Sequence, residues 1–139
     1  MLNRSTVRIM ALQVAICSAF LPVGCTASTR NVKLPERTTV SGIQIDIDKV
    51  YNKSSYLNPI WGVSGVATNQ NSTPLRTVQI ELGAYDSTGT KIAAAFAISG
   101  TLRSDSRWRF DAPFVSVIDR NLSIDEVKID SVNGIVPSD

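Results

Sequence analysis

Apolar and polar residues alternate along several short stretches of the chain from residue 40 onward. Residues 43–48 read Ile-Gln-Ile-Asp-Ile-Asp, and residues 77–84 carry apolar side chains at positions 78, 80, 82 and 84. Successive side chains of a β-strand point to opposite faces, so this pattern places one face in a core and the other in water. Both stretches are therefore predicted to be half-buried antiparallel strands.

Further strand-like segments follow at short intervals. They cover residues 61–68, 91–98, 107–112, 114–117 and 127–132. Dense turn sequences occupy residues 69–74 and 86–89, and no long amphipathic helix follows residue 39. This spacing predicts an all-β fold, an antiparallel immunoglobulin-like β-sandwich of about seven strands over residues 40–134.

The first 24 residues have the features of a bacterial export signal. Arg4 and Arg8 make a positive start, and residues 9–23 are almost wholly apolar. This apolar run is shorter than the roughly 20 residues that a permanent membrane-spanning helix needs. It ends at Leu-Pro-Val-Gly-Cys, which resembles the lipobox of bacterial lipoproteins, with Pro22 where an aliphatic residue is usual. The resemblance implies cleavage before Cys25 and acylation of that cysteine.

Two other interpretations of this segment stay open: a plain secretory signal, and a retained membrane anchor. Cys25 is the only cysteine outside the apolar run, which contains Cys17. Acylation accounts for a single leftover cysteine in an exported chain. Thr26 stands where an Asp commonly retains lipoproteins in the inner membrane. We therefore expect lipid anchoring in the outer membrane through Cys25, with a soluble periplasmic or secreted protein as the alternative.

Residues 25–39 are predicted to be the lipidated cysteine and a flexible tether. The stretch is rich in Ser, Thr, Arg and Lys, includes Pro35, and shows neither strand nor helix periodicity. The chain thus divides into a signal peptide at 1–24, a tether at 25–39 and a β-domain at 40–134.

Residues 60–115 resemble a bacterial FxLYD-type domain. The pattern of such domains includes a Gly-x-Val-x-Asn strand, which Gly65 and Asn69 match, with Ala67 in place of the valine. Residues 82–86 read Leu-Gly-Ala-Tyr-Asp, so the Tyr-Asp end of the signature is present while Leu and Ala replace its Phe and Leu. The resemblance implies an immunoglobulin-like sandwich found in exported proteins and lipoproteins, and it implies no catalytic residue.

Tyr85, Asp86 and Gly89 also have a physical interpretation as a structural turn motif. Asp86 is expected to open the turn by bonding to nearby backbone, and Gly89 to supply a positive φ. Tyr85 is expected at the end of a strand, with its ring at the edge of the core and its hydroxyl near water. Ligand contact by Tyr85 and Asp86 is the alternative.

Charge and composition argue against several function classes. The chain has 14 Lys+Arg and 12 Asp+Glu, and removing Arg4 and Arg8 leaves 12 of each from residue 26 onward. We therefore expect no nucleic-acid partner. The chain has no histidine, no nucleophile elbow and no phosphate loop. We expect no enzymatic activity, no catalytic residue and no cofactor.

Two groups of acidic residues are candidate cation sites. Asp46 and Asp48 share one strand face, and Asp125, Glu126 and Asp130 lie close together near the C-terminus. Calcium sites draw more oxygen ligands from a tight loop, so we interpret both groups as solvated strand faces and expect no metal.

A cluster of arginines and aromatic residues is the best candidate interaction surface. Arg103, Arg107 and Arg109 lie close to Trp108, and Arg with Trp is typical of interface hot spots. The alternative places the aromatic residues in the core and the arginines on the solvent face, partly neutralised by neighbouring aspartates. A second candidate surface is a long loop at residues 52–55, which Tyr51, Tyr56 and Trp61 flank; these three residues also suit a core edge.

Two function classes follow. The first is a lipid-tethered interaction or structural module that docks on another envelope protein, which exposed strand edges suit. The second is a binding protein for a small molecule, glycan or peptide, which a large apolar pocket with convergent polar groups favours. We prefer the first.

Overall fold

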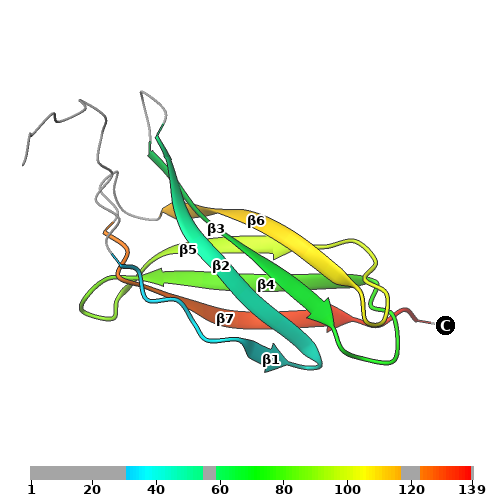
Figure 1. Ribbon diagram of the computed structural model, residues 1–139. Helices are drawn as coiled ribbons and strands as arrows, with labels where there is room; N and C mark the ends of the chain where they lie inside the picture. Colours follow the sequence, from blue (N-terminus) through cyan, green and yellow to red (C-terminus); the bar gives the residue numbers. More distant parts are fainter. Residues whose placement is uncertain (1–30, 55–58, 117–122, 139) are drawn as a thin grey trace, which may run out of the picture.

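The computed structural model describes residues 31–54, 59–116 and 123–138. The strands are β1 (Thr38–Val40), β2 (Ile43–Ser54), β3 (Pro59–Asn69), β4 (Thr77–Tyr85), β5 (Lys91–Ile98), β6 (Arg107–Ser116) and β7 (Glu126–Ile135) (Figure 1). All paired strands are antiparallel, which confirms the predicted all-β fold of about seven strands. Within these ranges no helix has the length and hydropathy to cross a membrane. The predicted signal helix and Cys25 lie outside the described residues.

The strands form one continuous sheet in the order β1-β2-β3-β6-β5-β4-β7. β6 links the two halves, because its first part pairs with β3 and Phe114–Ser116 pairs with β5. The sheet curls into a nearly closed barrel, in which β2 and β3 cross over β5, β4 and β7 (Figure 1). This pairing does not confirm the predicted division into two packed sheets.

The seam of the barrel lies between β7 and the chain that leads into β1. Lys33 forms a parallel bridge with Glu126. The Lys33 N–H donates to the Asp125 carbonyl at 2.9 Å, and the Val127 N–H donates to the Lys33 carbonyl at 2.9 Å. Val32 and Leu34 pack against the core. Residues 32–34, which the sequence assigns to the tether, therefore belong to the folded barrel, and β1 begins at Thr38, also within that segment.

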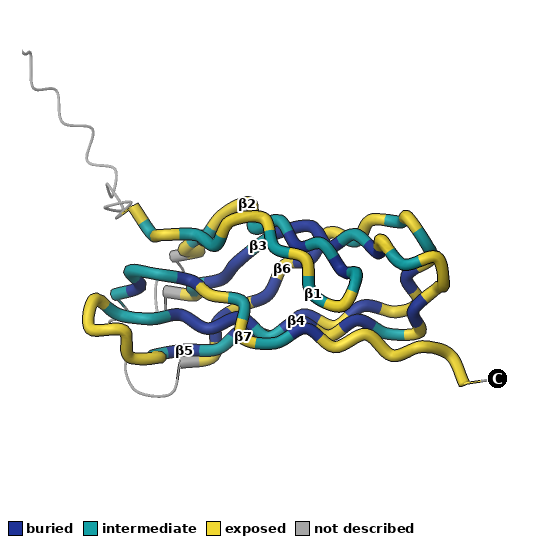
Figure 2. The backbone as a smooth tube through the Cα atoms, turned by 90° about the horizontal axis from the view of Figure 1, so that it is seen from below, coloured by how far each residue is buried: buried dark blue, intermediate teal, exposed yellow. Residues whose placement is uncertain are grey.

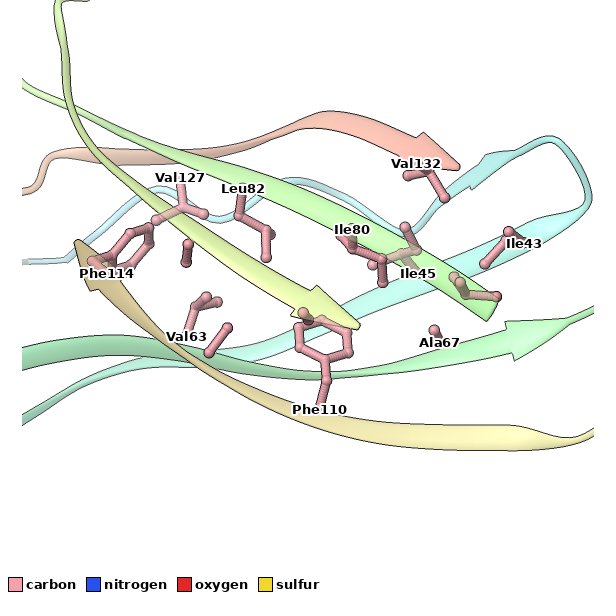
Figure 3. Close-up of a cluster of buried hydrophobic side chains, with 14 of the residues drawn as sticks. Ile43, Ile45, Val63, Ala67, Ile80, Leu82, Phe110, Phe114, Val127 and Val132 are labelled. Carbon is pink, nitrogen blue, oxygen red and sulfur yellow. The ribbon is translucent and has the colours of Figure 1, made fainter. Parts of the chain in front are cut away.

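The core fills the inside of the barrel with aliphatic side chains and two phenylalanines (Figure 3). Buried segments line the inner surface, and exposed ones gather at turns and on the outer face (Figure 2). The predicted alternation of residues 77–84 is confirmed, because Val78, Ile80, Leu82 and Ala84 are all fully buried. Full burial of a Val, Leu or Ile side chain stabilises a fold by about 1.5–3 kcal/mol.

One polar side chain organises an end of the barrel. Asn69 is fully buried at the end of β3. Its Nδ2 donates to the carbonyls of Thr73 at 3.0 Å and Leu102 at 3.1 Å, and its Oδ1 accepts from the Asn71 N–H at 3.0 Å. The Asn69 amide thus holds together two loops that are distant in sequence.

A β-bulge in β2 reverses the strand's alternation. Ile47 pairs with Gly65 and Lys49 pairs with Ser64, so Asp48 is an extra residue opposite β3. An inserted residue moves every later side chain to the other face. Ile43, Ile45 and Ile47 face the core, whereas after the bulge Val50 packs inward and its neighbours face outward.

Candidate interaction surface

The middle strand of the β2-β3-β6 face carries small residues on its outer side. Gly62, Ser64 and Val66 lie between β2 and β6 in the pairing register. Longer side chains from the two flanking strands therefore meet above β3. Val66 is only 6% exposed although it belongs to this outer side, because these side chains cover it.

Tyr51 packs over Gly62, and a Cβ at Gly62 would overlap the tyrosine ring. The Tyr51 hydroxyl donates to the Asp111 carboxylate of β6. Lys53 Nζ lies 3.7 Å from the same carboxylate and 4.7 Å from the centroid of the Tyr51 ring. Burial, followed by the hydrogen bond to Asp111, raises the pKa of Tyr51 to about 12.

Arginines neutralise the two aspartates that the sequence places on β2. Arg109 Nη1 lies 3.0 Å from Asp48 Oδ2, and Arg37 Nε lies 2.5 Å from Asp46 Oδ1. The hydrogen bond from Arg37 is the largest cause that lowers the pKa of Asp46. Among the described residues no group of three or more His, Cys, Asp or Glu could hold a metal ion.

A shallow depression of about 510 Å³ opens on this outer face. It is lined by Lys49, Tyr51, Lys53, Ser64, Arg109, Phe110 and Asp111. Of its three cationic side chains, Arg109 pairs with Asp48 and Lys53 lies near Asp111, whereas Lys49 forms no ion pair among the described residues. The depression combines these charges with the apolar surface of Tyr51 and Phe110.

The structure places the four predicted surface residues on one turn and the strand that follows it. Arg103, Arg107 and Arg109 are exposed, whereas Trp108 is half-buried and packs against the core. The Trp108 ring centroid lies 5.5 Å from that of Phe110. The aromatic side chains therefore stabilise the barrel, and the arginines carry the exposed chemistry.

A tight turn fixes Arg103 beside the start of β6. The Ser106 N–H donates to the Arg103 carbonyl at 3.2 Å, and the Ser106 hydroxyl donates to the same oxygen at 2.6 Å. Asp105 within this turn has a φ of 57°, which its short polar side chain tolerates. Within the described ranges, neither Arg103 nor Arg107 forms an ion pair. The charge of Arg107 nevertheless helps to lower the pKa of Asp46, which pairs with Arg37.

The Tyr85-Asp86-Gly89 motif lies elsewhere, at the β4–β5 turn. Asp86 Oδ1 accepts from the N–H groups of Thr88 at 2.9 Å and Thr90 at 3.0 Å, and Gly89 has a φ of 80°. The hydrogen bond from the Thr88 hydroxyl is the largest cause that lowers the pKa of Asp86. The motif builds the turn in the expected way.

Tyr85 and the acidic side chains of β7 form a polar network on the outside of β4 and β7. The Tyr85 hydroxyl donates to Asp130 at 2.7 Å, and that carboxylate lies 2.7 Å from Lys91 Nζ. Glu126 lies 3.2 Å from Lys33 Nζ. These acidic residues are neutralised by lysines.

Lys49, Tyr51 and Lys53 are surface residues that the sequence did not assign to the arginine cluster. Continuing the alternation of residues 43–47 points their side chains into the core, and only the bulge at Asp48 turns them outward. The Tyr51 hydroxyl reaches β6 because β2 and β6 flank the same strand, which local sequence does not reveal. Tyr56 and Cys25 lie outside the described residues.

The chain was also compared with known proteins. It matches no family model, no curated protein and no solved structure.

Proposed function

We propose that this protein is a lipid-tethered module of the bacterial cell envelope whose β-domain docks on another envelope protein. The apolar run at 9–23 and the lipobox-like sequence ending at Cys25 support export and anchoring. The finer features of the proposal are an immunoglobulin-like fold of the FxLYD type and attachment to the outer membrane.

The observation that carries the proposal is the exposed pair Arg103 and Arg107. Arg107 precedes half-buried Trp108 at the start of β6, Arg103 lies on the turn before it, and neither is ion-paired within the described residues. An arginine held near an aromatic anchor by a rigid turn and strand loses little freedom on binding, and such residues dominate protein interfaces.

In-cell crosslinking followed by purification and mass spectrometry tests this function. We expect one dominant partner with the wild-type protein and its loss with Arg103→Glu plus Arg107→Glu. Lys128→Glu plus Lys33→Glu is the matched control, because it makes the same charge change on the distant β7 side. Equal recovery of the partner by both double variants would refute docking through the arginine surface.

Anchoring is tested separately by fractionation of cells. Cys25→Ser removes the only sulfur that the lipobox-like sequence offers for acylation, so the protein should move from the membrane fraction to the soluble periplasm. Cys17→Ser is the control and should leave the protein in the membrane fraction. Retention of the Cys25→Ser protein in membranes would contradict lipid anchoring.

A second candidate function is binding of a small ligand, and one observation favours it. The depression on the β2-β3-β6 face, with Lys49 beside Tyr51 and Phe110 in its lining, suits a small molecule or glycan that carries negative charge. Crosslinking that recovers no specific protein, together with binding of an anionic glycan that Lys49→Glu abolishes, would support this function.

A further inference from the structure

One edge of β6 is turned away from β3. The Asn69 N–H donates to the Ser106 carbonyl at 3.0 Å, which continues the β3–β6 register just before β6 begins. Backbone groups in an antiparallel strand bond alternately to the two sides. The even-numbered residues of β6 therefore bond to β3. Arg107, Arg109 and Asp111 direct their N–H and C=O groups to the opposite side.

On that opposite side the pairing with β5 stops at a proline. β5 pairs with β6 only over Phe114–Ser116, and Pro113 precedes this segment. Proline has no N–H to extend the ladder. No strand in the described ranges pairs with the β5-facing edge of β6 from Arg107 to Asp111. These backbone groups form an open edge.

The side chains around the open edge define the chemistry of a partner. Arg103 and Arg107 supply positive charge, and neither lies within ion-pair distance of a described carboxylate, although the charge of Arg107 acts on Asp46. Asp111 adds no free negative charge, because it accepts the Tyr51 hydroxyl and lies near Lys53. On the inner side the edge borders Trp108, so inward side chains of an added strand would meet an apolar surface.

We propose that an extended segment of a partner protein, with acidic residues alternating with apolar ones, adds as a β-strand to the Arg107–Asp111 edge of β6. The backbone of this segment forms hydrogen bonds with the N–H and C=O groups of Arg107–Asp111 that do not pair with β5. Its carboxylates lie near Arg103 and Arg107, and its apolar side chains pack near Trp108. This proposal rests on the proposed function, in which the β-domain binds another protein, and it specifies how the partner binds.

Binding of a dye-labelled peptide, Thr-Glu-Val-Glu-Val-Glu-Thr, to the full-length protein in detergent tests the strand geometry by fluorescence anisotropy. Arg109→Pro removes one N–H of the open edge and leaves the β3 ladder intact, because residue 109 does not bond to β3. Arg109→Ala removes the same side chain and keeps the N–H, so it is the matched control. We expect Arg109→Pro to bind at least about tenfold more weakly than Arg109→Ala.

A second peptide keeps the test decisive if Arg109→Pro fails to fold. Backbone N-methylation at both the glutamates and the valines removes the donors that face β6, whichever way the peptide runs, and keeps every charge. The wild-type protein should then bind about tenfold more weakly. A lysine peptide of the same pattern should not bind the wild type but should bind Arg103→Glu plus Arg107→Glu.

Different results overturn the two proposals. Equal binding of the methylated and unmethylated peptides would overturn strand addition, even where crosslinking in cells has identified a partner. Crosslinking that recovers only a second copy of the chain through β6, or no protein at all, would instead remove the partner on which the inference rests.

Discussion

Two glycines on the outer surface of the barrel lie beneath tyrosine rings. Gly62 is covered by Tyr51, and Gly83 by Tyr85, where an added Cβ would lie 2.7 Å from the ring. In each case the tyrosine hydroxyl donates to a nearby aspartate, which also contacts a lysine. A glycine in a strand has no side chain to cover its backbone. The tyrosine ring covers that backbone and so replaces the missing packing.

The Tyr51 cluster predicts a loss of stability in alkali. The pKa of Tyr51 is raised from 10.0 to about 12, so the folded chain holds this proton more tightly than the unfolded chain. That contribution is fully present below pH 10.0 and disappears as the pH rises toward about 12. Urea unfolding across this range should show a smaller fall in the free energy of unfolding for Tyr51→Phe than for the wild type. Parallel falls in the two proteins would contradict the prediction.

Asn69→Ala should be among the most destabilising polar substitutions in the chain. The substitution removes the side-chain donor of two carbonyls: that of Leu102, in a buried hydrogen bond, and that of Thr73, in a partly buried one. An unsatisfied buried group costs about 1–3 kcal/mol, so the free energy of unfolding should fall by about 2–4 kcal/mol. Urea denaturation measures this change. Gln70→Ala, next along the chain but exposed, is the control and should cost less than about 0.5 kcal/mol; similar losses in both would contradict the role of Asn69.

The bulge is the element that decides which residues of β2 reach the surface. Deleting Asp48 restores strict alternation and drives Lys49 and Tyr51 toward the core, where a buried cation is strongly unfavourable. We expect urea unfolding followed by circular dichroism to show a cooperative transition for the wild type and none for the deletion variant. Asp48→Ala keeps the residue count and loses only the exposed pair with Arg109, so it should cost no more than about 1 kcal/mol. A cooperative transition in the deletion variant would show that the bulge is dispensable.

The elements that could be predicted from sequence are those whose pattern is local. β4 follows strict alternation over residues 77–84, and its buried face agrees with the prediction. β1 could not be predicted from the sequence, because Thr38–Val40 is too short to show an alternation of apolar and polar residues. The sequence divides the chain at Pro113, but β6 runs through it from Arg107 to Ser116, because the proline nitrogen faces β5 and interrupts no hydrogen bond to β3.

The candidate surface was predictable in part for the same reason. Alternation along β6 separates exposed Arg107 and Arg109 from inward Trp108. The ion-pair partner of Arg109, Asp48, comes from β2, which is two strands away in the sheet and far away in the sequence. Cross-strand neighbours depend on register and on the bulge, and neither is encoded by a pattern that a single segment shows.

At the scale of the whole molecule, the N-terminal segment completes the barrel. Deleting residues 31–34 removes the bridge to β7 and the contacts of Val32 and Leu34 with the core. Loss of two partly buried aliphatic side chains should lower the free energy of unfolding by about 1–3 kcal/mol. Hydrogen exchange should speed up at the Val127 amide, which donates to Lys33, and stay slow at Leu82 in the middle of the sheet. Unchanged exchange at Val127 would show that the seam holds without this segment.

The position of Lys33 also has a mechanical consequence. The chain enters the barrel at this residue, so tension on the N-terminal side acts first on the two hydrogen bonds to β7 and only afterwards on the β1–β2 ladder. The two hydrogen bonds of Lys33 at the seam would therefore break before the hydrogen bonds between the strands that surround the core. Under force the seam should therefore open first, while the rest of the sheet stays intact.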